Sequence, residues 1–120
     1  MAGVLPSDPP PGAADPAVVV VLITIPEAQA ASLSRRLVED GLAACVNQLP
    51  AVHSTYTWAG RVEEADETLL YVKTTVARYG ELERRVRELH PYEMPEMLAV
   101  PVAAGFAPYL DWIKRSVSPA

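Results

Sequence analysis

The 120-residue sequence predicts one α+β domain in which helices pack on one face of an antiparallel sheet. Runs of strand length alternate with stretches of helical periodicity, in the order strand, helix, strand, strand, helix, strand, helix. Two consecutive strand-like runs are joined by a turn, which indicates a hairpin. Half of the residues are hydrophobic and 21% are charged, so the chain can form a core and is not disordered as a whole.

A proline-rich leader precedes the domain. Residues 1–16 combine glycine, alanine and two aspartates with Pro6, Pro9, Pro10, Pro11 and Pro16. Proline lacks a backbone N–H, and this composition offers no apolar face to bury. We therefore predict a disordered leader over residues 1–16 and a single domain over residues 17–120.

The first strand and the first helix follow directly. Residues 17–25 form a continuous β-branched run, which is typical of a central strand covered on both faces. After Pro26 the apolar residues recur at helical spacing, and Gly41 supplies a stop. The apolar positions of this amphipathic helix are Ala30, Leu33, Leu37 and Val38.

A long hairpin comes next. Residues 44–58 and 67–75 are rich in Val, Thr and aromatic residues, with a connection through Ala59 and Gly60. Pro50 interrupts the first strand, so the hairpin should bend there. Apolar residues occupy both faces between Leu69 and Val72, which indicates that a partner subunit covers part of the hairpin.

The C-terminal third predicts a helix, a strand and a helix. Apolar residues recur at helical spacing over 79–89, and Pro91 ends that helix. Residues 97–102 read as an edge or bulged strand because they contain Pro101. Residues 109–117 form a short amphipathic helix. The complete order is that of a ferredoxin-like βαββαβ sandwich with an extra C-terminal helix.

Charge and cysteine content restrict the partners. The formal net charge of −5 repels nucleic acid and offers no general attraction to anionic membranes. Cys45 is the single cysteine, so no intrachain disulfide can form, which favours a reducing cytoplasm. The longest apolar run, residues 17–25, is much shorter than a bilayer span. We expect a cytoplasmic protein that binds neither nucleic acid nor membranes.

Several segments resemble the CutA family of divalent-cation tolerance proteins, in order and from Val18 to Val117. The strongest is the stretch LHPYEMPEM from Leu89 to Met97. The others are Leu42-Ala-Ala-Cys-Val-Asn47, Tyr56-Thr-Trp58, Gly60-Arg-Val-Glu63, Lys73-Thr74 and Tyr109-Leu-Asp-Trp-Ile113.

This resemblance implies more than a fold. It implies a ferredoxin-like subunit that forms a tight homotrimer through its long hairpin, with an architecture similar to the PII-like signalling proteins. It also implies an association with copper or other divalent cations, but no particular reaction. No cofactor is expected to be obligatory.

Cys45 and His90 are the candidate metal ligands, because thiolate and imidazole bind copper and zinc. Two ligands do not complete a site, so a metal site must be assembled between subunits. The alternative for Cys45 is a small buried hydrophobe. For His90 it is an imidazole that faces the last carbonyls of the preceding helix.

A ligand cleft is the second hypothesis, and aromatic walls with polar groups are typical of one. The alternative is an aromatic subunit interface with a charged rim. Pro91 and Pro95 should hold the intervening loop stiffly. The candidate cleft residues are Tyr56, Trp58, Glu67, Lys73, His90, Tyr92 and Glu93.

An enzyme is not expected, because the sequence contains no GxSxG, P-loop or GxGxxG motif. The sequence therefore predicts a homotrimer of the divalent-cation response that binds copper or another divalent cation weakly between subunits. The alternative is a PII-like regulatory trimer that binds a small anionic metabolite or a partner's tail in clefts between subunits.

Overall fold

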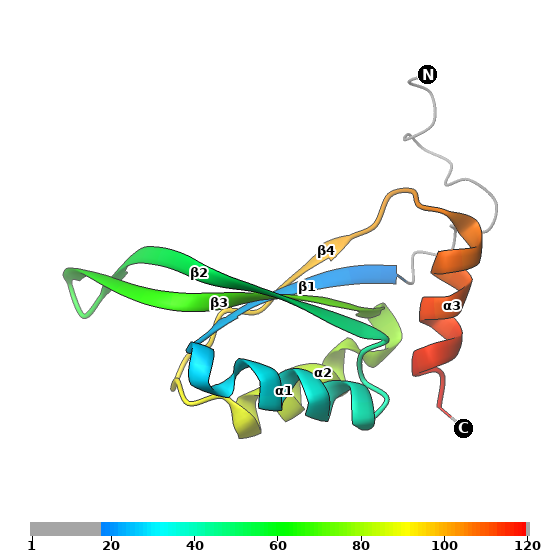
Figure 1. The fold of residues 1–120 in the computed structure, drawn as a ribbon, viewed down its shortest axis with the longest axis horizontal. Helices are drawn as coiled ribbons and strands as arrows, with labels where there is room; N and C mark the ends of the chain where they lie inside the picture. The colour runs from blue at the N-terminus through cyan, green and yellow to red at the C-terminus, as the bar shows by residue number, and fades with distance from the viewer. Residues whose placement is uncertain (1–17, 120) are drawn as a thin grey trace, which may run out of the picture.

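The computed structural model describes residues 18–119 and confirms the ferredoxin-like α+β sandwich (Figure 1). The sheet has the strand order β2-β3-β1-β4, and every neighbouring pair is antiparallel. The predicted leader, residues 1–16, lies outside the described residues. The elements are β1 (Val18–Ile25), α1 (Glu27–Glu39), β2 (Cys45–Trp58), β3 (Arg61–Thr75), α2 (Val76–Leu89), β4 (Leu98–Pro101) and α3 (Ala107–Val117).

The main core lies between the sheet and helices α1 and α2. Alternate residues of β1 point to this side, and Val21, Ile23 and Ile25 are completely buried. Leu37 of α1 and Leu82 of α2 are equally inaccessible. The two helices lie below the sheet in Figure 1 and close this layer. None of the helices in the described range is both long and apolar enough to cross a membrane.

Helix α3 forms a second, smaller core at one end of the sheet. Leu110 and Ile113 are buried against Val18 at the start of β1. Figure 1 shows α3 standing beside this end of the sheet, apart from α1 and α2. On the sheet face that α1 and α2 leave free, α3 therefore covers only the end near the start of β1.

The hairpin is longer than predicted. The sequence placed the start of the second strand at Glu67, but β3 begins at Arg61 and pairs with β2 up to Trp58. The missed segment is highly charged and carries no apolar alternation, because both of its faces are largely exposed. Strand pairing, rather than burial, maintains this part of β3.

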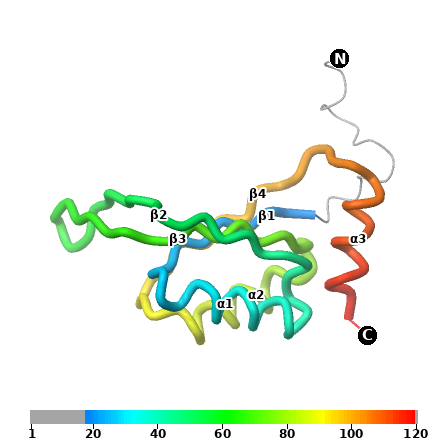
Figure 2. Tube along the Cα trace, viewed as in Figure 1, coloured from blue at the N-terminus to red at the C-terminus, as the bar shows by residue number. Residues whose placement is uncertain are grey.

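The predicted bend lies at a β-bulge. The β2–β3 register shifts between Leu49 and Val52, which leaves Pro50 and Ala51 unpaired, and Ala51 has a φ of 63°. Beyond the bulge the two strands project past the helices as a two-stranded ribbon (Figure 2). We call this ribbon, residues 52–67, the hairpin arm.

The arm ends in a two-residue turn. Trp58 pairs with Arg61, and both turn residues have positive φ, 53° for Ala59 and 77° for Gly60. Such turns favour Asn-Gly, since an alanine in the left-handed region is strained. We expect Ala59→Asn to raise the free energy of unfolding by about 0.5–1.5 kcal/mol in guanidinium titrations at fixed protein concentration. Ala103→Asn is the control, since Ala103 is exposed in a loop, and it should change the free energy of unfolding less. An equal increase in both variants would show that strain at Ala59 is not the cause.

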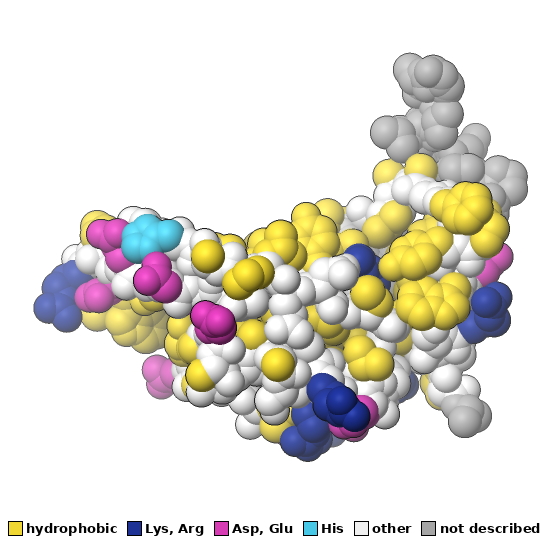
Figure 3. All heavy atoms as spheres, in the orientation of Figure 1, with side chains coloured by type: hydrophobic (Ala, Val, Ile, Leu, Met, Phe, Trp, Pro, Cys, Tyr) yellow, Lys and Arg dark blue, Asp and Glu magenta, His cyan; other side chains and the backbone are white. Residues whose placement is uncertain are grey.

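The sheet face opposite α1 and α2 is largely uncovered; we call it the open face. Leu22 of β1 lies at its centre, between Tyr71 of β3 and Leu98 of β4. Tyr71 is 40% exposed and Leu98 57%. Hydrophobic side chains gather over the sheet and over α3 in Figure 3. The open face continues through Val20, Val100, Leu49 and Leu69.

Candidate ligand pocket

One pocket of about 1020 Å³ lies where the hairpin arm meets the loop between α2 and β4. The arm contributes residues 54–58 and Glu67, and the loop contributes residues 91–97. Thr24 of β1 and Leu98 of β4 complete the lining. This volume is sufficient for a small metabolite. The pocket therefore exists only because the arm extends beyond the sheet and the proline-bracketed loop crosses its base.

Tyr92 and Glu67 form the polar centre of the pocket. The Tyr92 hydroxyl donates a hydrogen bond of 2.8 Å to Oε2 of Glu67. Glu67 is only 6% exposed. Partial burial, followed by the hydrogen bond and the negative charge of Glu67, raises the pKa of Tyr92 to about 12. Tyr92 therefore remains a hydrogen-bond donor at neutral pH and holds the carboxylate in one orientation.

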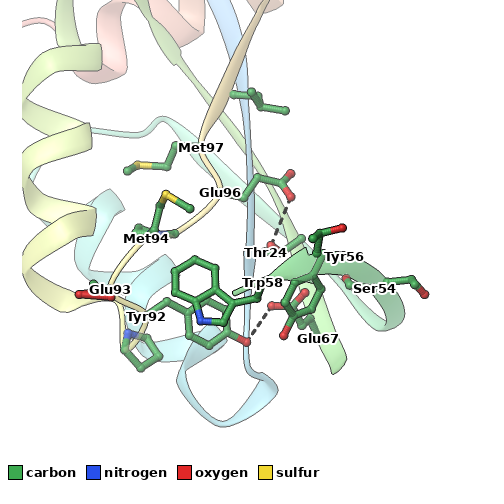
Figure 4. A pocket seen from close by; sticks show the side chains of 15 residues that line it. Thr24, Ser54, Tyr56, Trp58, Glu67, Tyr92, Glu93, Met94, Glu96 and Met97 are labelled. Carbon is green, nitrogen blue, oxygen red and sulfur yellow. Dashed lines mark hydrogen bonds between the residues drawn. The ribbon is translucent and has the colours of Figure 1, made fainter. Parts of the chain in front are cut away.

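Three aromatic rings surround this carboxylate. Figure 4 shows Tyr56, Trp58 and Tyr92 grouped around Glu67, whereas the Glu93 side chain points away from them. The three residues are between 38% and 45% exposed in the subunit, so they are accessible to a ligand there. Glu96 lies at the other end of the pocket, with Oε1 3.5 Å from the Thr24 hydroxyl that donates to it.

His90 supports the pocket from beneath. Its Nε2 lies 2.8 Å from the carbonyl oxygen of Thr24, which can only accept, so Nε2 carries a proton. Its Nδ1 accepts the backbone N–H of Tyr92 at 3.1 Å. His90 is only 7% exposed, and both nitrogens of its ring are engaged in hydrogen bonds. It contacts a strand carbonyl rather than the last carbonyls of α2, and it positions the start of the pocket loop.

Lys73 and Cys45 lie away from the pocket, on the open face. Cys45 Sγ is 3.9 Å from Nζ of Lys73, and Asn47 accepts a hydrogen bond from the same ammonium group. Cys45 is half-exposed rather than buried. The Cys45–Lys73 pair lies beside Val20 of β1, whereas His90 is hydrogen-bonded to Thr24 of the same strand. Val20 and Thr24 are four residues apart, which corresponds to roughly 13 Å along a strand. Cys45 and His90 therefore do not meet within one subunit.

Five of the seven predicted cleft residues line the pocket: Tyr56, Trp58, Glu67, Tyr92 and Glu93. His90 lies behind the lining, and Lys73 is separate from it. The sequence reasoning missed Thr24, Met94, Glu96 and Met97. The last three belong to the LHPYEMPEM stretch that the sequence had already singled out, whereas nothing local to Thr24 indicated its position. Within residues 18–119 no group of three or more His, Cys, Asp or Glu side chains is arranged to hold a metal ion.

The opposite side of the hairpin arm carries an acidic cluster around His53. Nδ1 of His53 is 2.8 Å from Asp66 and Nε2 is 2.6 Å from Glu64. These hydrogen bonds, first that to Asp66 and then that to Glu64, raise the pKa of His53 above its ordinary value of 6.5. Both partners, Asp66 and Glu64, belong to the part of β3 that the sequence did not predict.

The pH dependence of His53 can be observed directly. Because the folded pKa is raised, the stabilising contribution of the charged imidazole is present below pH 6.5 and is lost as the pH rises through the higher folded value. We expect an NMR titration midpoint above 6.5 that falls in Asp66→Asn and falls less in Glu64→Gln. A midpoint at or below 6.5 in the unmodified chain would show that these contacts do not form in solution.

Comparison with known proteins identifies the chain's relatives. The family model described as CutA1 divalent ion tolerance protein matches residues 19–116. The chain belongs to the CutA family. It is 48% identical over 98 residues to the divalent-cation tolerance protein CutA of Thermus thermophilus, with 81% of this chain and 95% of that protein covered. It is 41% identical to the protein CutA of Mus musculus over 115 residues, which cover 92% of this chain and 65% of the mouse protein.

The solved structures of the CutA family agree with the fold. The structure described as PII-like protein CutA from Nostoc sp. PCC 7120 in apo form superposes with a TM-score of 0.78 at 35% identity. The alignment covers 83% of this chain and 97% of the Nostoc chain. The resemblance inferred from the LHPYEMPEM stretch is thus confirmed. The mouse protein is longer, and the present chain spans about two thirds of its length.

Proposed function

We propose that this CutA chain forms a cytoplasmic homotrimer that takes part in the response to divalent metal ions without catalysing a reaction. Membership of the divalent-cation tolerance family supports this proposal most strongly. The free, half-exposed thiol of Cys45 is compatible with a reducing compartment.

The open face supports the trimer. Leu98 and Val100 of β4 are 57% and 46% exposed, and Tyr71 of β3 and Trp112 of α3 are 40% and 39% exposed. A contiguous apolar patch of this kind is unfavourable in water and is typical of a subunit interface. Among the helices of residues 18–119, none lies beneath the hairpin arm, so a neighbouring subunit is the simplest cover for it as well (Figure 2).

Weak binding of copper or another divalent cation is proposed at positions between subunits. Cys45 lies on the open face and could meet ligands from a neighbouring subunit there. His90 would have to give up one of its two hydrogen bonds to bind a metal. Of the two predicted ligands, Cys45 therefore requires less rearrangement.

Metal titrations test this proposal. Zinc binding by calorimetry and Cu(I) binding by chelator competition should both be detectable, and Cys45→Ser should weaken them roughly tenfold or more, the loss of one soft ligand. Gln48→Ala, which changes an exposed side chain on the same strand and leaves the thiol and its neighbours in place, serves as the matched control. Equal affinities in the unmodified chain, Cys45→Ser and His90→Asn would exclude both residues as ligands.

A regulatory trimer with the architecture of PII-like proteins is the second candidate function, and the pocket favours it. A preformed pocket with an oriented carboxylate at its centre is what a ligand-responsive protein requires. The sequence reasoning suggested an anionic ligand, for which Lys73 was to supply the charge. Lys73 lies on the open face, so its ammonium group does not line the pocket of its own subunit.

A further inference from the structure

The pocket carries negative charge that no basic side chain in the described part of the chain neutralises. Its lining contains Glu67, Glu93 and Glu96 and no lysine, arginine or histidine. Within residues 18–119, none of these glutamates forms an ion pair with a basic side chain. Glu67 is also 94% buried, so its charge acts in a region of reduced solvent screening. The pocket should therefore attract cations and repel anions.

The walls around that charge are aromatic and apolar. Tyr56, Trp58 and Tyr92 present their rings around the Glu67 carboxylate (Figure 4). Met94 and Met97 add thioether side chains from the loop. Faces of tyrosine and tryptophan attract positive charge through the ring quadrupole, and aromatic cages bind alkylated ammonium groups in this way.

We propose that the pocket binds a small organic cation, a quaternary ammonium compound, with its charge at Glu67 and its alkyl groups against the three aromatic rings. This inference deepens the second candidate function and rests on it. The Glu67–Tyr92 hydrogen bond fixes the carboxylate, so the ligand does not have to order it on binding.

Two other ligand types fit less well. A bare divalent ion needs several oxygen ligands that converge on one point, and Glu93 points away from the group around Glu67. A small anion would face three carboxylates without a compensating base. The combination of one buried carboxylate and three rings is suited to a soft, weakly hydrated cation.

Choline and its uncharged isostere 3,3-dimethylbutan-1-ol separate charge from shape. In NMR titrations of the full-length protein, choline should bind at least roughly tenfold more tightly than the isostere, the effect of one cation–π and carboxylate interaction. Glu67→Gln should remove most of this preference, and Trp58→Leu should weaken choline binding more than Trp58→Phe, which keeps an aromatic face. Glu39→Gln on α1, an equal change in charge on the helix layer, should leave binding unchanged.

A failure of the organic-cation proposal can be distinguished from a failure of the trimer proposal. The mass of each sample is measured alongside binding. A trimer that fails to bind choline, binds the isostere equally well, or binds choline unchanged in Glu67→Gln overturns the organic-cation inference but leaves the trimer standing. Tighter binding of citrate than of choline would restore the anionic ligand instead. A monomer that binds neither compound would overturn both proposals.

Discussion

Leu22→Glu is expected to convert the proposed trimer into monomers of 13.0 kDa. Leu22 occupies the centre of the open face, paired with Tyr71 on one side and with Leu98 on the other. In the free subunit a carboxylate at this position would remain in contact with water. In the trimer it would be buried without a partner, at a cost on the order of 3 kcal/mol or more per subunit. Analytical ultracentrifugation at low micromolar concentration measures the result.

Val38→Glu is the matched control for this substitution. Val38 is an apolar side chain, 43% exposed, but it lies on α1 and therefore in the helix layer on the other side of the sheet. This variant should keep the mass of the unmodified protein. If Leu22→Glu also keeps that mass while it remains folded by circular dichroism, the open face is not the subunit interface.

His90→Ala is expected to lower the free energy of unfolding by about 2–4 kcal/mol in the presence of a metal chelator. The substitution removes the hydrogen bond to the Thr24 carbonyl and the one from the Tyr92 N–H, and it leaves a cavity beneath the loop. Because His90 is only 7% exposed, water does not readily replace these contacts. Guanidinium unfolding at fixed protein concentration measures the loss.

His53→Ala, the same substitution at an exposed histidine of the arm, should cause a much smaller change. If both variants are equally stable without metal, the hydrogen bonds of His90 do not stabilise the fold. That result would favour a role for His90 as a metal ligand. His90→Ala could instead lose much of its free energy of unfolding without metal. Any reduced metal binding by this variant would then result from a disturbed loop and not from the loss of a metal ligand.

The fold was predictable because its elements differ in pattern. The β-branched run of β1 and the periodic helices α1 and α2 each contain enough apolar residues to define their type. The first half of β3 was missed, since its side chains are charged and exposed and only pairing with β2 defines it as a strand. Pro50 and Pro101 were informative because proline restricts strands in a specific way.

The site was only partly predictable, for a spatial reason. Tyr92 and Glu93 are adjacent in sequence and were found as a motif, but their relation to Glu67 depends on the path of the arm. Lys73 was grouped with them because of its residue type, although strand register places it with Cys45 on the open face. Register and twist are set by the whole sheet, so a side chain's neighbours across strands cannot be inferred from local spacing.

Sedimentation equilibrium of the unmodified full-length protein tests the central claim most directly. The trimer requires a mass three times 13.0 kDa, about 39 kDa, that persists at low micromolar concentration. The proposed cover of the open face and of the hairpin arm, and the proposed metal positions, all depend on that assembly. A mass of 13.0 kDa under the same conditions would contradict it, because the open face would then remain exposed in the folded protein.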